Sequence, residues 1–334
     1  MTESFGARLR TKPVRTLLFG VGTIGAGIGR LAVERDELDL VAAVDSAPAQ
    51  AGRPMYEALG LDRAGGPAIE ADAEQALANV KPELVLHATG SFLPDVLPQL
   101  LACVRAGANV VSTCEELSYP WLRHPELAKQ LDAEAKAHGV AVLGTGVNPG
   151  FIMDTLVVAL SGVCQQIERV KITRVVDVAT RREQLQRKVG AGITLEEFRV
   201  RVQAGRFGHV GLKESCWLLA AGLGWQLDAL EETFEPVVAS DGTAAGMLQT
   251  ARGTLAGREV IEGIVQMSIG AERPRDEIEI AGTPPVRLVI EGGVPGEPAT
   301  AAVIVNAASR VVGHAPGLLT MLDLPLPAGK GVTP

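Results

Sequence analysis

Three glycines near the N-terminus, Gly20, Gly22 and Gly25, have the spacing GxGxxG. They follow an apolar run that is typical of a β-strand and open an amphipathic stretch that is typical of a helix. In that context the first glycine permits a tight turn, the second lets the backbone approach a pyrophosphate at the helix N-terminus, and the third allows close packing of helix on strand. The sequence therefore predicts a dinucleotide site formed by Gly20, Gly22, Thr23, Ile24 and Gly25.

An acidic residue follows this motif at the distance that recognition of a ribose requires. Asp45 lies twenty residues after Gly25, at the end of the second predicted strand, where a carboxylate can accept hydrogen bonds from two ribose hydroxyls. Its charge would repel a 2′-phosphate, which favours NAD. Ser46 and Arg53 follow closely, however, and a serine with a nearby arginine suits that phosphate, so use of NADP stays open.

The elements that position these residues alternate along the first 144 residues. We expect strands at 14–20, 38–45, 83–89, 109–113 and 140–144, and helices at 24–34, 94–106 and 125–138. Apolar strands that alternate with helices indicate an α/β fold with a Rossmann-type doubly wound parallel sheet. Ligands of such a sheet bind beyond the carboxyl ends of its strands, so further candidates for contact with the cofactor are Ala88, Thr89, Thr113 and Asn148.

The pattern changes at GTGVNPGF, residues 144–151, where turn-forming residues gather. We place a dinucleotide-binding domain at 1–147 and an α+β substrate-binding and dimerisation domain at 148–299. In the second domain we expect a long strand at 168–177 and then mainly strands, with helices near 153–160, 194–204 and 213–221. A last helix at about 300–312 opens a segment, 300–334, that we expect to pack back on the first domain.

Composition narrows the class of ligand. A net charge of −8 over 334 residues and a low aromatic content argue against nucleic acid or an anionic membrane as a partner, so we expect a small molecule. The four cysteines are far apart and form no CxxC pair, which predicts free thiols and no metal site. No apolar run reaches the ~20 residues of a membrane helix, and the first residues lack the apolar core of a signal peptide, so we expect a cytoplasmic protein.

Several longer strings resemble one family of enzymes. They are VLHATGSF at 85–92, NVVSTCEELSYPW at 109–121, GTGVNPGF at 144–151, TRREQLQRKVGAG at 180–192 and GHVGLKES at 208–215. Together they resemble the 2,4-diaminopentanoate dehydrogenases and the related native amine dehydrogenases, over nearly the whole chain. The resemblance implies an N-terminal domain like that of dihydrodipicolinate reductase, a homodimer, and oxidative deamination of an amine or the reverse reductive amination of a ketone. The HHxxKxD string of true dihydrodipicolinate reductases is missing, and Glu115 stands where homoserine dehydrogenases would have a lysine.

The chemistry of amine oxidation directs attention to the acids after the fourth strand. An alkylamine is an ammonium ion at pH 7, so the enzyme must hold a cation and remove a proton before hydride leaves. A carboxylate facing an apolar pocket does both, since burial raises its pKa and makes it a better base. Glu115 and Glu116 are the candidates, and we predict that Glu115 is catalytic, as the resemblance implies. The alternative is that both are solvated acids at a helix N-terminus.

The remaining candidates would form the substrate pocket. Phe151, Phe207 and His209 are our pocket residues, with Tyr119 and Trp121 as further possible walls, although large aromatic residues and single histidines are more often structural. Arg181, Arg182 and Lys188 would suit a substrate carboxylate, but we favour a solvated face or a dimer contact for them.

Three functions follow from these residues. The first is an NAD(P)-dependent amine dehydrogenase acting on simple amines. The second is a 2,4-diaminopentanoate dehydrogenase, which a buried arginine aimed at the substrate would favour over an all-apolar pocket. The third, from another class, is a non-catalytic dinucleotide-binding redox sensor.

Overall fold

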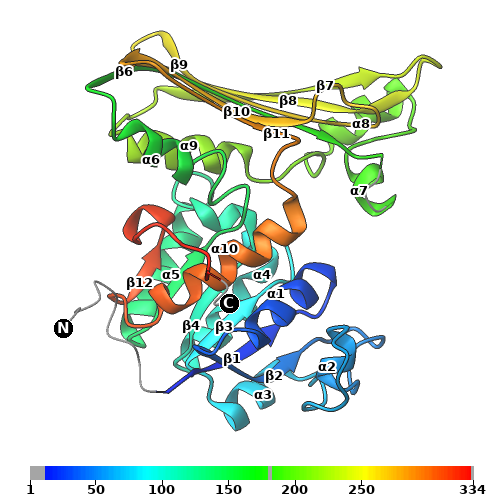
Figure 1. Cartoon of the computed structure of the whole chain (residues 1–334), viewed down its shortest axis with the longest axis vertical. Coiled ribbons are helices and arrows are strands. Elements are labelled where there is room, and N and C mark those ends of the chain that lie inside the picture. Colours follow the sequence, from blue (N-terminus) through cyan, green and yellow to red (C-terminus); the bar gives the residue numbers. More distant parts are fainter. Residues whose placement is uncertain (1–11, 180–182, 332–334) are drawn as a thin grey trace.

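The structure is a computed structural model that describes residues 12–179 and 183–331, without the side chains of residues 184 and 185. It contains two six-stranded sheets, one above the other in Figure 1. Within the described residues, no helix is both long and apolar enough to cross a membrane. The four cysteines are unpaired, and three of them are buried.

The first sheet is wholly parallel and has the strand order β12-β5-β4-β3-β1-β2. Its strands are short and almost entirely buried, as expected for a sheet covered on both faces. They are β1 (Val14–Phe19), β2 (Leu38–Val44), β3 (Leu84–His87), β4 (Asn109–Ser112), β5 (Ala141–Gly144) and β12 (Gly317–Leu319).

Helices pack on both faces of this sheet and create two separate apolar cores. One core contains α1 (Thr23–Val33), the short α2 (Met55–Ala58) and α10 (Gly296–Val311), and the other contains α3 (Ala73–Val80), α4 (Leu93–Arg105) and α5 (Pro125–Ala137). Proline lies in the first turn of both α4 and α5, where its missing N–H costs no helical hydrogen bond. This is the predicted doubly wound architecture.

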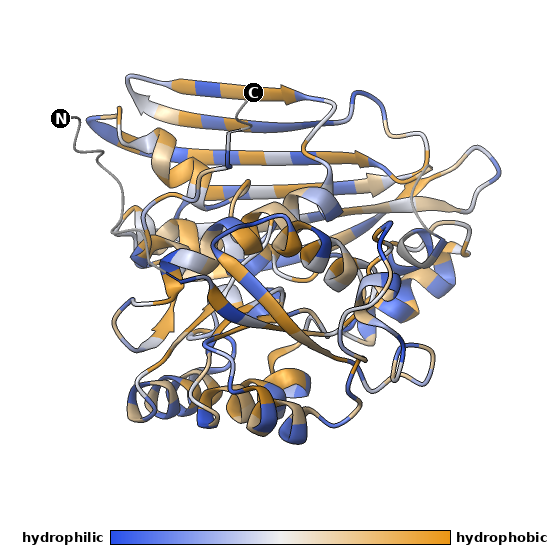
Figure 2. Cartoon of the chain, turned by 60° about the horizontal axis from the view of Figure 1, so that its bottom comes forward, coloured by the Kyte–Doolittle hydropathy of each residue, from blue (hydrophilic) through white to orange (hydrophobic). Residues whose placement is uncertain are grey.

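The second sheet is mixed and has the order β11-β10-β6-β9-β8-β7. All neighbours are antiparallel except β6 and β9. The strands are β6 (Gln166–Asp177), β7 (Ala229–Val238), β8 (Ala244–Leu255), β9 (Arg258–Ser268), β10 (Arg275–Thr283) and β11 (Val286–Glu291). Hydrophobic and hydrophilic residues alternate along these strands (Figure 2), as in a sheet whose two faces differ in burial.

The remaining helices lie between this sheet and the first one (Figure 1). They are α6 (Thr155–Ser161), α7 (Glu183–Lys188), α8 (Leu195–Gln203) and α9 (Leu212–Gly222). The other face of the sheet has no helix packed on it in the part of the chain that Figure 1 draws as ribbon. Helix α9 also contacts the short 3-10 turn η1 (Glu115–Ser118) that follows β4, so it bridges the two halves of the molecule.

The chain returns to the first sheet at its C-terminal end. Helix α10 packs along α1, and β12 pairs with β5 in parallel before the 3-10 turn η2 (Met321–Asp323). The helix begins at Gly296, four residues before the predicted start at 300, because Pro298 is tolerated in a first helical turn. The division at 147/148 and 299/300 remains our proposal for the domain limits.

Candidate active site

The glycine turn after β1 is closely packed on one side and open on the other. Gly20 has φ +96°, and a Cβ there would lie 2.5 Å from the carbonyl oxygen of Ala88. A Cβ on Gly25 would lie 1.9 Å from the carbonyl oxygen of Gly20, whereas one on Gly22 would meet nothing within 4 Å. Gly22 is the N-cap of α1, followed by Thr23 and Ile24 in the first turn. Free space therefore lies at the positive end of α1, where an anion is favoured.

Asp45 is fixed beside this turn by backbone groups. Its Oδ2 accepts a hydrogen bond of 2.7 Å from the N–H of Val21, and its Oδ1 accepts one of 2.9 Å from the N–H of Ala47. Ser46 is exposed. Arg53 donates to Gln50 at 3.1 Å and lies 3.7 Å from Glu57. The arginine that would serve a 2′-phosphate is therefore already paired with other side chains.

A hydrogen-bond network around the buried His87 joins the carboxyl ends of β3 and β4. His87 contacts Ser112 through Nδ1 and Gln99 through Nε2, both at 2.9 Å. Thr89 donates to Gln99 at 2.6 Å, and the N–H of Thr113 donates to the carbonyl oxygen of His87 at 2.9 Å. Burial lowers the pKa of His87 to about 4, so the ring is neutral near pH 7. The network fixes Thr89 and Thr113 at the edge where a ligand of this fold binds.

Glu115 opens the 3-10 turn after β4 and is half-buried. Burial raises its pKa, while Lys188 of α7 and a hydrogen bond with the Ser91 side chain lower it. A Cβ on Gly211, the N-cap of α9, would lie 3.1 Å from the Cβ of Glu115. The residue therefore stands where β4 of the first sheet meets α7 and α9 of the second half.

Glu116 has a different set of partners and is 5% exposed. Its Oε2 accepts hydrogen bonds of 2.8 Å from the N–H of Leu93 at the start of α4 and from Nε2 of His124. Its Oε1 lies 3.7 Å from Nε of Arg123. Both carboxylate oxygens thus face protein groups, and Glu116 is not a solvated acid. The choice of Glu115 as the acid that contacts a ligand stays a prediction.

The loop that carries Asn148 is tied to α9. Ser215 of α9 donates to Asp154 at 2.7 Å and lies 3.3 Å from Oδ1 of Asn148, whose amide donates to the sulfur of Met153 at 3.2 Å. Asp154 is fully buried and also accepts from the N–H of Gly150. The Asn148–Pro149 peptide bond is cis. Phe151 follows in the same turn and is half-buried.

His209 lies in the loop between α8 and α9, next to β8 of the second sheet. Its N–H donates to the Gln249 side chain at 3.0 Å, and its carbonyl oxygen accepts from the same side chain at 2.9 Å. Its Nε2 is buried and has no hydrogen-bond partner among the described residues. Burial, with the charges of Lys188 and Arg174, lowers the pKa of His209 to about 3. A neutral imidazole with one unused nitrogen therefore lies near two cations.

The predicted aromatic walls have mixed surroundings. Phe207 packs edge-on against Phe198 and Phe234, with ring centroids 4.9 and 6.5 Å apart, and so belongs mainly to the core of the second half. Tyr119 and Trp121 contact each other, with ring centroids 5.2 Å apart.

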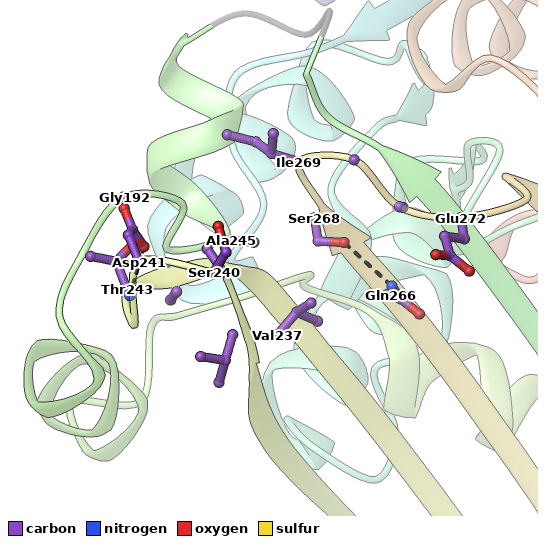
Figure 3. Close-up of a pocket in the computed structure, with 15 residues that line it drawn as sticks. Gly192, Val237, Ser240, Asp241, Thr243, Ala245, Gln266, Ser268, Ile269 and Glu272 are labelled. Carbon is purple, nitrogen blue, oxygen red and sulfur yellow. Dashed lines mark hydrogen bonds between the residues drawn. The ribbon is translucent and has the colours of Figure 1, made fainter.

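Two cavities are open to solvent, and the linings of both leave out Glu115. The first has a volume of about 700 Å³ and lies at one end of the second sheet (Figure 3), among residues of the β7–β8 hairpin, the end of β9 and the loop to β10. The second, of about 400 Å³, is lined by Tyr119, Leu122, Trp217 and the segment after α9. The pocket residues Phe151, Phe207 and His209 line neither cavity. In the described residues, no three His, Cys, Asp or Glu side chains are grouped to hold a metal ion.

Sequence reasoning missed several residues around Glu115. Ser91, Arg123 and Glu214 were not singled out, because their partners lie far away in sequence and no local motif marks them. Lys188, which was expected on a solvated face or at a dimer contact, is exposed, and its charge also lowers the pKa of Glu115. Arg181 and Arg182 lie outside the described residues.

Comparison with known proteins adds three findings. Residues 151–331 match the family model for the C-terminal domain of 2,4-diaminopentanoate dehydrogenase. The chain is 32% identical to the 2,4-diaminopentanoate dehydrogenase of Acetoanaerobium sticklandii and 26% identical to an amine dehydrogenase of Streptomyces virginiae, with 94% of this chain covered in each case and 94% and 96% of those proteins. The solved structure of an amine dehydrogenase from Mycobacterium smegmatis superposes with a TM-score of 0.86 and 26% identity, covering 97% of this chain and 99% of that one.

Proposed function

We propose, from the premise that this chain belongs to the 2,4-diaminopentanoate dehydrogenase family, that it oxidatively deaminates a small primary amine and reductively aminates the matching carbonyl compound. The observation that carries the proposal is the surroundings of Glu115. It is half-buried at the carboxyl end of β4, next to the N-terminus of α9, while the neighbouring Glu116 is fully engaged by protein groups.

Glu115 would act on the substrate nitrogen. Its carboxylate binds the substrate ammonium ion and accepts one proton from it, which frees the nitrogen lone pair. Burial raises the pKa of Glu115, which makes it a stronger base than a solvated glutamate, while Lys188 and the hydrogen bond with Ser91 lower that pKa. When bound, the nicotinamide ring supplies the acceptor for the hydride that leaves the carbon bearing the nitrogen. Water then adds to the carbon–nitrogen double bond of the imine, and loss of ammonia leaves the carbonyl compound.

The residues at the glycine turn fit a nicotinamide dinucleotide. The open space above Gly22 at the N-terminus of α1 suits a pyrophosphate, and Thr89, Thr113 and Asn148 would contact the nicotinamide half. We propose a preference for NAD, supported by the fixed carboxylate of Asp45 and by the pairing of Arg53 with Gln50 and Glu57. Solved relatives of lower identity that bind NAD, such as GenD2 of gentamicin A biosynthesis, at 16%, share the fold.

A second candidate function is oxidation of 2,4-diaminopentanoate, the diamino acid in the family name. The surroundings of His209 favour this substrate. The unused Nε2 of this residue and the charges of Lys188 and Arg174 suit a substrate carboxylate. Against it, Arg174 is already paired with Asp276 at 2.6 Å and with the carbonyl oxygen of Val294 at 2.7 Å. A plain amine therefore remains our first proposal.

We further propose a cytoplasmic homodimer. No helix covers one face of the second sheet in the part of the chain drawn as ribbon (Figure 1), so in a monomer this broad face would be exposed to solvent. This supports contact of the face with a second copy of the chain. Four unpaired cysteines, three of them buried, suit a reducing compartment.

The proposal is tested by oxidation of NADH and NADPH with ammonia and a panel of short ketones, aldehydes and 2-amino-4-ketopentanoate. We expect oxidation of the cofactor that requires both ammonia and a carbonyl compound. Preference for pentan-2-one over the amino ketone supports the plain amine, and the reverse supports the diamino acid, in which case His209→Leu should weaken only the amino ketone. Tight binding of NADH without turnover on any compound would contradict the proposal and favour a redox sensor.

A further inference from the structure

One arginine joins the turn that carries Glu115 to the helix that begins against it. Arg123 lies five residues after that turn and is about one-third exposed. Its Nε donates to Oε1 of Glu214, and its Nη2 lies 3.4 Å from Oε2 of the same carboxylate. Its Nε is also 3.7 Å from Glu116. The guanidinium group therefore faces one carboxylate from each half of the molecule.

The two carboxylates that share this cation are almost out of reach of water. Glu214 is 0% exposed and Glu116 is 5% exposed. Burial raises the pKa of Glu214, whereas Arg123 lowers it. A buried carboxylate without its partner is costly, because neither water nor another charge replaces the lost interaction. The position of Glu214 therefore depends on Arg123, and Arg123 also places a positive charge 3.7 Å from Glu116, which Leu93 and His124 hold from the other side.

Both acids lie close to Glu115. Glu116 follows it directly in η1, and its carboxylate also fixes the start of α4 through Leu93. Glu214 lies in the first turn of α9, three residues after Gly211, whose Cβ position is 3.1 Å from the Cβ of Glu115. A movement of α9 relative to η1 would change the space around the Glu115 side chain.

We propose that Arg123 is a positioning residue for Glu115, because it clamps η1 through Glu116 to α9 through Glu214. The inference rests on the proposed function. A cation that merely stabilised the fold would affect the melting temperature and leave turnover unchanged far below it. A clamp at the site changes kcat at a temperature where the protein is fully folded, since misplacement by about 1 Å can cost on the order of 100-fold.

The first variant is the double substitution Arg123→Met/Glu214→Met, which removes both charges of the pair. Glu116 keeps its hydrogen bonds from Leu93 and His124, so this variant is expected to fold. Arg123→Lys is the second variant, because a lysine keeps the charge but lacks the planar fork of donors. The matched control is Arg105→Met/Glu134→Met, a two-bond pair at 2.9 and 3.2 Å at the opposite end of α4 from Leu93.

The experiment measures kcat, KM for the carbonyl substrate and the Kd of NADH well below the melting temperature of each variant. We expect kcat to fall by about 10- to 100-fold in both Arg123 variants, with the Kd of NADH unchanged, and wild-type values in the control. A kcat within about twofold of wild type in the folded variants, or an equal loss of NADH affinity, would overturn the clamp. Absence of ammonia-dependent turnover in the wild-type protein would instead overturn the proposed function.

Discussion

The backbone N–H of Val21 donates a hydrogen bond of 2.7 Å to Oδ2 of Asp45. The acid at the end of β2 is thereby tied to the glycine turn at the end of β1, twenty-four residues away in sequence. Because Ala47 holds the other oxygen at 2.9 Å, the orientation of the carboxylate is set by the protein before any ligand binds. A fixed negative charge at this place makes cofactor choice a property that substitution can change.

Replacing Asp45 by serine is expected to lower the preference for NAD over NADP by about tenfold or more, because the charge that repels a 2′-phosphate is removed. The measurement is the ratio of kcat/KM for the two cofactors. Asp39→Ser, an exposed acid on the same strand, is the control and should keep the wild-type ratio. An unchanged ratio in Asp45→Ser would assign cofactor choice to other residues.

Two glycines of the same motif should respond in opposite ways to alanine. Gly25→Ala forces a methyl group to within 1.9 Å of the carbonyl oxygen of Gly20, so we expect a loss of about 1–3 kcal/mol or more of stability. Gly22→Ala meets no protein atom within 4 Å and should fold normally, but should bind NADH more weakly. Thermal unfolding and NADH titration of both variants check this pair, and wild-type NADH affinity in Gly22→Ala would refute the assigned pyrophosphate site.

Lys188→Gln is expected to shift the acid limb of the pH–rate profile for amine oxidation to higher pH. In the proposed mechanism oxidation needs ionised Glu115, so the rate should fall as the pH drops through the pKa of Glu115. Removal of Lys188 takes away a charge that lowers this pKa. Arg187→Gln is the control, since this neighbour is paired with Glu183 at 2.6 Å on the surface. If the acid limb of the pH–rate profile lies at the same pH in both variants, Lys188 does not act on Glu115.

His87 should make the protein less stable in mild acid. Its pKa is about 4 in the folded protein and 6.5 for an ordinary histidine, so between these pH values the unfolded chain binds a proton that the native protein does not. Stability that is complete above pH 6.5 is therefore lost as the pH falls toward 4, at up to about 1.4 kcal/mol per pH unit. Urea unfolding at several pH values gives the free energy of unfolding as a function of pH. In His87→Gln this free energy should change less with pH than in the wild-type protein, and an equal change would contradict this account.

The sequence predicts those features of the structure that depend on residues close together in the chain. The strand–turn–helix unit around Gly20 and the acid at Asp45 carry their own pattern, as do the helices after β3 and β4 that begin with proline. The pairing of β6 with β9 and of β12 with β5 joins segments that are far apart in sequence. No short sequence pattern predicts these pairings. The same holds for Arg123 and Glu214, 91 residues apart, which look like ordinary charged residues in the sequence and form a pair only in the folded protein.

Phe207 shows why the surroundings of one aromatic side chain are hard to predict from sequence. We expected it as a wall of the substrate pocket, although large aromatic residues are more often structural. Its ring packs against Phe198 of α8 and Phe234 of β7, and these contacts are set by the fold of the second half. Contact of Phe207 with the substrate stays a prediction.

The central claim concerns the single carboxylate of Glu115, and its most direct test is the nearly isosteric variant Glu115→Gln. An amide neither pairs with an ammonium ion nor accepts its proton, so we predict a loss of about a thousandfold in kcat for ammonia-dependent NADH oxidation, with the Kd of NADH within about twofold of wild type. Glu126→Gln, at an exposed acid in the first turn of α5, should retain full activity. A folded Glu115→Gln protein with wild-type turnover would contradict the account.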